Sequence, residues 1–298
     1  PINEALVRQL IATQFPQWAS LPVKAVQFSG WDNRTFHLGS QMLVRLPSGA
    51  EYAAQVEKEQ YWLPKLAPHL PLLIPAPLAM GEPTKEYPWK WSVYKWIGDN
   101  TASIDQIEDM SQFAVELAKF LRALQRIDAT NGPVAGEHNF YRGGNLATYD
   151  GETRTALEAL ENKVAAQAIT IVWNTAHSSV WQRPPVWIHG DIAITNLLMD
   201  KGHLSAVIDF GQPGIGDPAC DLVIAWTYFD QESREAFRAA LAVDSDTWAR
   251  GRGWALWKAL CWAYPGSNCI DWRVVKEILA DYQYCTLREQ GSANHEGV

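Results

Sequence analysis

One stretch of the chain, HGDIAITNLLMDKGHLSAVIDFG, concentrates side chains that could do chemistry. It places Asp191 and Asn196 before a short apolar run and Asp209 after a second one. The turn residues Asp200-Lys201-Gly202 separate two β-type runs, which predicts an antiparallel hairpin. Residues that pair across such a hairpin have numbers that add up to about 403, close to the 405 of Asn196 and Asp209. We therefore expect these two side chains nearly opposite each other, with Cβ atoms about 5 Å apart.

An amide oxygen and a carboxylate at that spacing make an oxygen-only site. Such a site suits Mg²⁺, which binds one or two carboxylates together with waters and substrate phosphates. Asp191 precedes Asn196 by five positions, so a tight loop can bring it to the edge of the metal site as a proton acceptor for an attacking hydroxyl. The structural alternative is that these residues only cap turns, where Asp and Asn are common.

The elements that must position these residues fall into two halves. In the first half, residues 23–47 and 75–98 alternate in the manner of strands, with a tight turn at Gly39-Ser40 and a hinge at 91–98. A helix is predicted over 52–70, interrupted near Pro64. The second half is helical, beginning with a helix that Ser111 caps. Further helices are predicted within 149–168, 233–243 and 246–264. This order indicates an α+β architecture with a cleft between two lobes.

Composition and charge limit the classes of partner that the protein could bind. The net charge of −8 and the pI near 5.4 argue against nucleic acid and an anionic membrane, and they suit a cationic or neutral small substrate. The N-terminal segment reads as an amphipathic helix instead of a signal peptide, and no apolar run reaches membrane-spanning length. No C-x-x-C pair occurs, so we expect reduced thiols and a cytoplasmic protein. The four cysteines are Cys220, Cys261, Cys269 and Cys285.

The catalytic stretch resembles that of kinases. HGDIAITN has the pattern histidine-x-aspartate, four residues, asparagine, and DFG begins 18 residues after the aspartate. The glycine of HGD and the following GIGDPACDL resemble the aminoglycoside phosphotransferase family of bacterial small-molecule kinases. The resemblance covers nearly the whole chain, through FSGWDNRTFHL, VRLP, KEQYWLPKLA, WSVYKWIG, HNFYRGGNLATYD and GRGWALWKAL.

This resemblance implies a two-lobed, protein-kinase-like fold with a small β-rich lobe at residues 1–95 and a larger helical lobe at 96–298. It implies Asp191 as the catalytic base and Asn196 and Asp209 as Mg²⁺ ligands. His189 would brace the loop, and Asp217 and Asp221 would brace the site and cap the following helix.

In the first lobe, the resemblance implies a nucleotide site. Arg45 takes the place of the strand lysine that contacts phosphates, and Glu59 is the carboxylate that pairs with it. Backbone amides from Gly30 to Asn33 would cover the phosphates, although a single glycine makes a poor phosphate motif. The backbone from Tyr94 to Trp96 would bind the purine.

The implied activity is transfer of the γ-phosphate of ATP or GTP to a hydroxyl of an aminoglycoside-like compound. A macrolide, a choline-like amino alcohol or a sugar is the alternative acceptor, and a catalytically idle nucleotide-binding module is the alternative of another class. A protein kinase is disfavoured, because no APE-like element or long activation segment follows DFG. The candidates for an acidic acceptor wall are Asp230, Glu232 and Glu235, although a solvated helix start explains them equally well.

Overall fold

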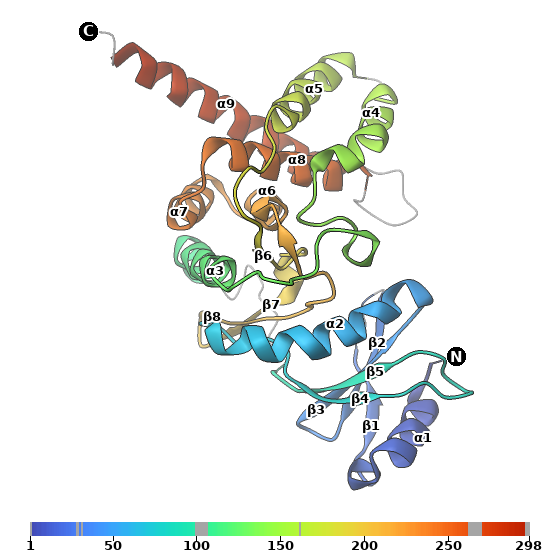
Figure 1. Ribbon diagram of the computed structural model, residues 1–298. Helices are drawn as coiled ribbons and strands as arrows, with labels where there is room; N and C mark the ends of the chain where they lie inside the picture. The colour runs from blue at the N-terminus through green and yellow to red at the C-terminus, as the bar shows by residue number, and fades with distance from the viewer. Residues whose placement is uncertain are drawn as a thin grey trace.

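The protein has a strand-rich first lobe and a helix-rich second lobe, as expected for the α+β kinase-like fold (Figure 1). The structure is a computed structural model that describes residues 2–27, 30, 32–98, 107–160, 162–261 and 270–295. The first lobe is one antiparallel sheet in the order β1-β2-β3-β5-β4. Its strands are β1 (Val23–Ala25), β2 (Asn33–Leu38), β3 (Met42–Pro47), β4 (Pro77–Gly81) and β5 (Trp91–Lys95).

Helix α1 (Glu4–Gln14) covers this sheet because its apolar positions share one face. Its buried Val7, Leu10 and Ile11 form a core with sheet residues that include Val44 and Val93. The expected hinge at 91–98 is mostly strand β5, which pairs with both β3 and β4. The sheet therefore ends at Lys95, close to the boundary expected between the lobes.

Helix α2 (Ala50–Leu66) joins the two lobes. The predicted interruption near Pro64 is wrong, because the helix continues through this residue and ends at Leu66, before the 3₁₀ turn η2 (Ala67–His69). A proline removes one N–H donor and crowds the carbonyl four residues earlier, so the cost of Pro64 falls on the turn before it, and the helix continues despite this cost. Leu63 and Leu66, the buried residues on either side of Pro64, pack into the core of the second lobe.

The second lobe begins its helices at α3 (Met110–Gln125). The N-cap is Asp109 and not Ser111 as predicted, because the Asp109 carboxylate accepts the Gln112 N–H at 2.9 Å. The predicted range 149–168 contains α4 (Asp150–Glu158) and overlaps the start of a second helix, α5 (Lys163–His177). The ranges 233–243 and 246–264 overlap α7 (Gln231–Leu241) and α8 (Ser245–Cys261); residues 262–264 lie outside the described part. The remaining helices among the described residues are η1 (Pro16–Trp18), η4 (Glu137–Asn139), η5 (Leu146–Tyr149), η6 (Ile194–Asn196), η7 (Pro218–Leu222), α6 (Ile224–Thr227) and α9 (Trp272–His295).

The predicted hairpin is present as β7 (Leu197–Asp200) and β8 (His203–Val207). The segment at Leu73 binds its outer edge, since the Leu73 N–H donates to the Ser205 carbonyl at 3.1 Å and the Val207 N–H donates to the Leu73 carbonyl at 2.9 Å. A second antiparallel pair, β6 (Val186–Ile188) and β9 (Gly214–Gly216), was not predicted and flanks the hairpin in the sequence. The two pairs hold both ends of the catalytic stretch.

Within the described residues, no helix is long and apolar enough to cross a membrane. The cysteines that the structure describes, Cys220, Cys261 and Cys285, are free thiols, and Cys220 is buried. Cys269 lies outside the described residues.

Candidate active site

The loop that carries Asp191 follows strand β6 and turns sharply at Gly190. Gly190 has φ of +87°, and a Cβ there would lie 2.6 Å from the Gln212 carbonyl oxygen. Only glycine fits this position without a shift of the backbone. The bend ends the pairing of β6 with β9, and Asp191 follows directly after it.

Buried polar groups fix this loop. The Asp221 carboxylate, which is fully buried, accepts the N–H groups of His189 at 2.8 Å and Gly190 at 2.7 Å. The His189 Nδ1 accepts the Asp191 N–H at 3.2 Å, so the ring proton lies on Nε2, which donates to the Ile208 carbonyl at 3.0 Å. His189 thus links the loop to Ile208, the residue before Asp209.

Asn196 and Asp209 flank the open end of the hairpin. A bulge between Leu198 and Met199 shifts the register, so that the Ile208 N–H donates to the Asn196 carbonyl at 2.8 Å and Asp209 lies one residue further along. The Asn196 amide nitrogen donates to the Asp191 carbonyl at 3.0 Å. Asp209 adopts the left-handed φ of +64°, and its Oδ1 accepts from Arg45 Nη2 at 3.0 Å.

The donor set fits Mg²⁺. The described residues contain no group of three or more His, Cys, Asp or Glu side chains that could hold a metal, so an ion here would depend on Asn196, Asp209, waters and phosphate oxygens, as Mg²⁺ prefers. Because the Asn196 nitrogen donates to Asp191, its amide oxygen remains a possible ligand. Burial and the nearby charge of Asp209 raise the pKa of Asp32, and a divalent cation would relieve this repulsion.

Arg45 is the centre of the charge cluster in the first lobe. Its guanidinium contacts Glu59 at 3.5 Å and Asp209 at 3.0 Å, so it connects α2 to the catalytic stretch. Burial lowers the pKa of Arg45, but Glu59 and Asp209 outweigh this and raise it above its usual value. The Tyr94 hydroxyl donates to Glu59 Oε2 at 2.5 Å, which supplies a second partner for a carboxylate that is only 2% exposed.

The other expected nucleotide residues lie near this cluster or at the end of β5. Gly30 is exposed, Asn33 begins β2 and is buried, and Ser29 and Trp31 lie outside the described residues. The backbone N–H of Trp96 donates to the Gln41 carbonyl at 2.8 Å, and that of Lys95 to the Ala76 carbonyl at 2.9 Å. A purine contact at Tyr94–Trp96 would therefore have to use other groups of this segment.

Asp217 lies behind the site. It caps the 3₁₀ helix η7, accepting the Ala219 N–H at 3.1 Å, and its carboxylate binds Arg250 Nε at 2.7 Å. Burial raises the pKa of Asp217, although Arg250 opposes this effect. Asp217 therefore fixes η7 to α8, and η7 carries Asp221.

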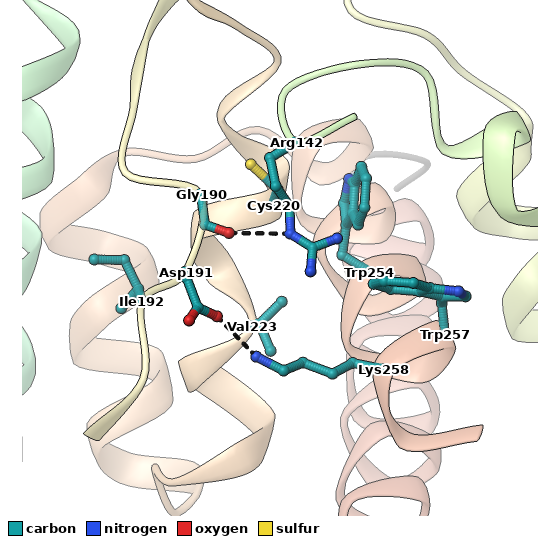
Figure 2. Close-up of a pocket in the computed structure, with 9 residues that line it drawn as sticks. All are labelled: Arg142, Gly190, Asp191, Ile192, Cys220, Val223, Trp254, Trp257 and Lys258. Atoms are coloured by element: carbon teal, nitrogen blue, oxygen red, sulfur yellow. Dashed lines mark hydrogen bonds and ion pairs between the residues drawn. The ribbon is translucent and has the colours of Figure 1, made fainter. Parts of the chain in front are cut away.

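The side chain of Asp191 faces a group of residues that the sequence did not single out (Figure 2). Lys258 Nζ of α8 lies 3.0 Å from Asp191 Oδ1. Burial raises the pKa of Asp191, but attraction and hydrogen bonding from Lys258 bring it below its usual value. Arg142 Nε donates to the Gly190 carbonyl at 3.1 Å, and the Arg142 guanidinium lies 4.8 Å from the Trp257 ring centre. The motifs HNFYRGG and GRGWALWKAL contain these residues, but nothing in their spacing indicated a shared pocket.

The candidate acidic wall lies elsewhere. Asp230 caps α7 by accepting the Ser233 N–H at 2.9 Å, and Glu235 on α7 contacts Arg288 at 3.8 Å. Helix α7 packs against α3 (Figure 1). Neither these residues nor Glu232 line the pocket at Asp191.

The family model described as "Phosphotransferase enzyme family" matches residues 24–254. The chain belongs to this family. The match includes both the Arg45 cluster and the catalytic loop, and it ends before Trp257 and Lys258.

Known proteins agree with this assignment. The chain is 30% identical over 128 residues to an aminoglycoside 3'-phosphotransferase of Escherichia coli, which covers 41% of this chain and 46% of that protein. The chain thus spans about half the length of the curated relatives it matches. The fold resembles that of the GDP and kanamycin complex of APH(2'')-IIIa, with a TM-score of 0.72, 20% identity and coverage of 97% of this chain and 99% of the other. It also resembles macrolide 2'-phosphotransferase MphH from Brachybacterium faecium, with a TM-score of 0.60, 20% identity and coverage of 84% and 87%.

Proposed function

We propose that the protein is a small-molecule kinase that transfers the γ-phosphate of ATP or GTP to a hydroxyl group. The observation that carries this proposal is the position of Asp191. The Asp191 loop contacts Asn196, and its carboxylate lines a pocket. A hydroxyl that enters there would lie beside the base and close to the proposed metal and phosphate site.

In the proposed reaction, the acceptor oxygen forms a bond to the γ-phosphorus, and the bond from that phosphorus to the β,γ-bridging oxygen breaks. Asp191 takes the hydroxyl proton, and the products are a nucleoside diphosphate and a phosphate ester. Arg45, held by Glu59 and Asp209, offers a cation to the phosphates. Mg²⁺ bound at Asn196 and Asp209 would neutralise phosphate charge during transfer.

Further parts of the proposal concern the setting of this reaction. Residues 1–95 bind the nucleotide, with Gly30, Asn33 and the Tyr94–Trp96 segment near it, and residues 96–298 bind the acceptor. The relatives are named as aminoglycoside and macrolide phosphotransferases, which makes an aminoglycoside-like compound the first acceptor to test. We place the protein in the cytoplasm, with no nucleic acid or membrane partner.

The test is a pair of measurements on the wild type and Asp191→Asn. Thermal shift with Mg²⁺ and ATP or GTP should show stabilisation of both proteins, since Asp191 is not a proposed nucleotide contact. Turnover with an accepted alcohol should fall by about 10²–10⁴-fold in Asp191→Asn. Equal turnover would overturn the base assignment, and a lack of stabilisation of the wild type by either nucleotide would overturn the kinase proposal.

A further inference from the structure

The pocket in front of Asp191 differs in charge from the chain as a whole. It is a small cavity of about 10 Å³ that opens to solvent, and it lies between the catalytic loop, η7 and α8. Trp254, Trp257 and Lys258 come from α8, and Figure 2 shows Lys258 and Arg142 on either side of the space that Asp191 faces. The reacting hydroxyl of the acceptor must reach this space from the solvent side to meet the base.

Cations outnumber carboxylates among the described residues that line the pocket. Asp191 is the carboxylate there, and Arg142 and Lys258 are the cations. The fourth titratable residue, Cys220, is neutral, because burial raises the pKa of its thiol well above the usual value. The net charge of the lining is therefore positive, in contrast to the −8 of the whole chain.

The nearest carboxylates behind the lining already have partners. Asp221 accepts two backbone N–H groups of the catalytic loop, and Asp217 binds Arg250. Glu152 accepts a hydrogen bond from the Trp257 indole. None of these three carboxylates is among the residues that line the pocket.

We propose that the preferred acceptor is an alcohol that carries a carboxylate or phosphate group near its reacting hydroxyl, and that Lys258 binds this anion. Lys258 is partly exposed, at 29%, so its ammonium can exchange one oxyanion for another. When Lys258 binds the anion of the acceptor, it releases Asp191 Oδ1, the oxygen it contacts in the free protein. This oxygen is then available to take the hydroxyl proton. Arg142 adds positive charge on the far side, and the Trp254 and Trp257 rings contact the carbon skeleton.

This inference rests on the proposed kinase function and narrows its acceptor. Whole-chain charge suggested a cationic or neutral substrate, but only the local groups contact the acceptor, and charge attraction falls off within about 8–10 Å in physiological salt. An ammonium group beside the reacting hydroxyl would instead meet Lys258 and Arg142.

The experiment compares acceptors that differ only in the anion. Glycerate is tested against glycerol and glucose 6-phosphate against glucose, with kanamycin as a polycationic probe. Binding is measured by calorimetry in the presence of Mg²⁺ and ADP, and turnover is measured with Mg²⁺ and ATP or GTP. We expect an anionic probe to bind about tenfold more tightly than its neutral partner, and the two pairs separate carboxylate from phosphate.

Variants assign this preference to Lys258. Lys258→Met should abolish the preference, Lys258→Arg should retain most of it, and the exposed Lys119→Met should leave it unchanged. The inference is overturned if neither anionic probe binds more tightly than its neutral partner, or if the preference survives in Lys258→Met. Turnover of kanamycin without any anion preference would leave the kinase function standing and remove this inference alone.

Discussion

Two cations hold the two ends of the active site in different ways. Arg45 on the phosphate side is 15% exposed and contacts two carboxylates, one of them also bound by Tyr94. Lys258 on the acceptor side is 29% exposed and contacts Asp191 from α8. Arg45 belongs to a network of contacts between the lobes. Lys258 instead lines a pocket that is open to solvent.

The difference suggests a division of labour. A nucleotide brings the same phosphate groups in every cycle, so its cation can be fixed in advance by buried partners. The acceptor must enter and leave next to the base, so its cation has to exchange partners. The following predictions test whether the Arg45 cluster is the rigid half and the Lys258 pair the exchangeable half.

The largest effect is expected at Asp209, where the two halves meet. Asp209→Asn removes a proposed Mg²⁺ ligand and the charge that Arg45 Nη2 contacts. Affinity for ATP or GTP in the presence of Mg²⁺ should fall about a hundredfold, measured by calorimetry with and without the metal. Asp200→Asn, in the turn of the same hairpin and exposed, is the control and should bind normally. Metal-dependent binding that persists in Asp209→Asn would place the metal elsewhere.

Arg45→Met should destabilise the protein as well as weaken nucleotide binding. It leaves the Glu59 carboxyl group 2% exposed and without its cation, and breaking a buried pair on one side costs about 3–5 kcal/mol. Urea unfolding should show this loss, and Arg45→Met/Glu59→Gln should recover most of it. Arg8→Met, from an exposed pair with Glu4, should cost less than about 1 kcal/mol. A cost for Arg45→Met as small as that of the Arg8 control would mean that the cluster is not rigid.

The two halves also differ in how far the sequence could predict them. Asp191, Asn196 and Asp209 lie in one short stretch around a single hairpin, so local spacing carried most of their geometry, and only the bulge at Leu198 shifted the expected register. Lys258 lies 67 residues from Asp191 in the sequence. No local pattern can show that α8 packs against η7 and turns Lys258 toward the loop, because this depends on the core of the second lobe.

The same limit explains the smaller errors. The helix at Pro64 continues because tertiary packing holds Leu63 and Leu66 in the second core, which outweighs the cost of a proline in the last turn. The cap at Asp109 is a local choice between two good capping residues, Asp and Ser, two positions apart.

The exchangeable half can be tested through pH. Burial raises the pKa of Asp191, and Lys258 brings it below its usual value; without Lys258, burial dominates and this pKa rises. The carboxylate is the active form, so activity is lost as pH falls through its pKa. In Lys258→Met the acid limb of the kcat/KM profile should therefore move to higher pH, whereas Lys258→Arg should keep it near the wild-type position. Identical acid limbs in all three proteins would show that Lys258 does not act on the base.

A third cation, Lys58 on α2, gives the smallest expected effect and a contrast to both pairs. Its ammonium donates to the neutral His138 Nδ1 at 3.1 Å, across the lobes, since His138 Nε2 contacts the Val134 carbonyl at 2.8 Å. Burial lowers the pKa of Lys58 from 10.5 to about 8, and Glu59 only partly opposes this effect. Between pH 8 and 10.5 the unfolded chain binds more protons at this residue than the folded chain, so the free energy of unfolding rises with pH.

Unfolding at pH 7.5 and at pH 10 should therefore show the wild type gaining about 1–2 kcal/mol relative to Lys58→Met. The exposed Lys119→Met should show no such gain. Because the comparison is with a variant that lacks only this ammonium, titration of the tyrosines and cysteines cancels. The Lys58 ammonium, which has no carboxylate in direct contact, would then weaken the packing of the two lobes at neutral pH. Arg45, which contacts two carboxylates, stabilises this packing. A constant difference between the wild type and Lys58→Met would mean that the Lys58 ammonium stays solvated, and that the contact with His138 adds no strain between the lobes.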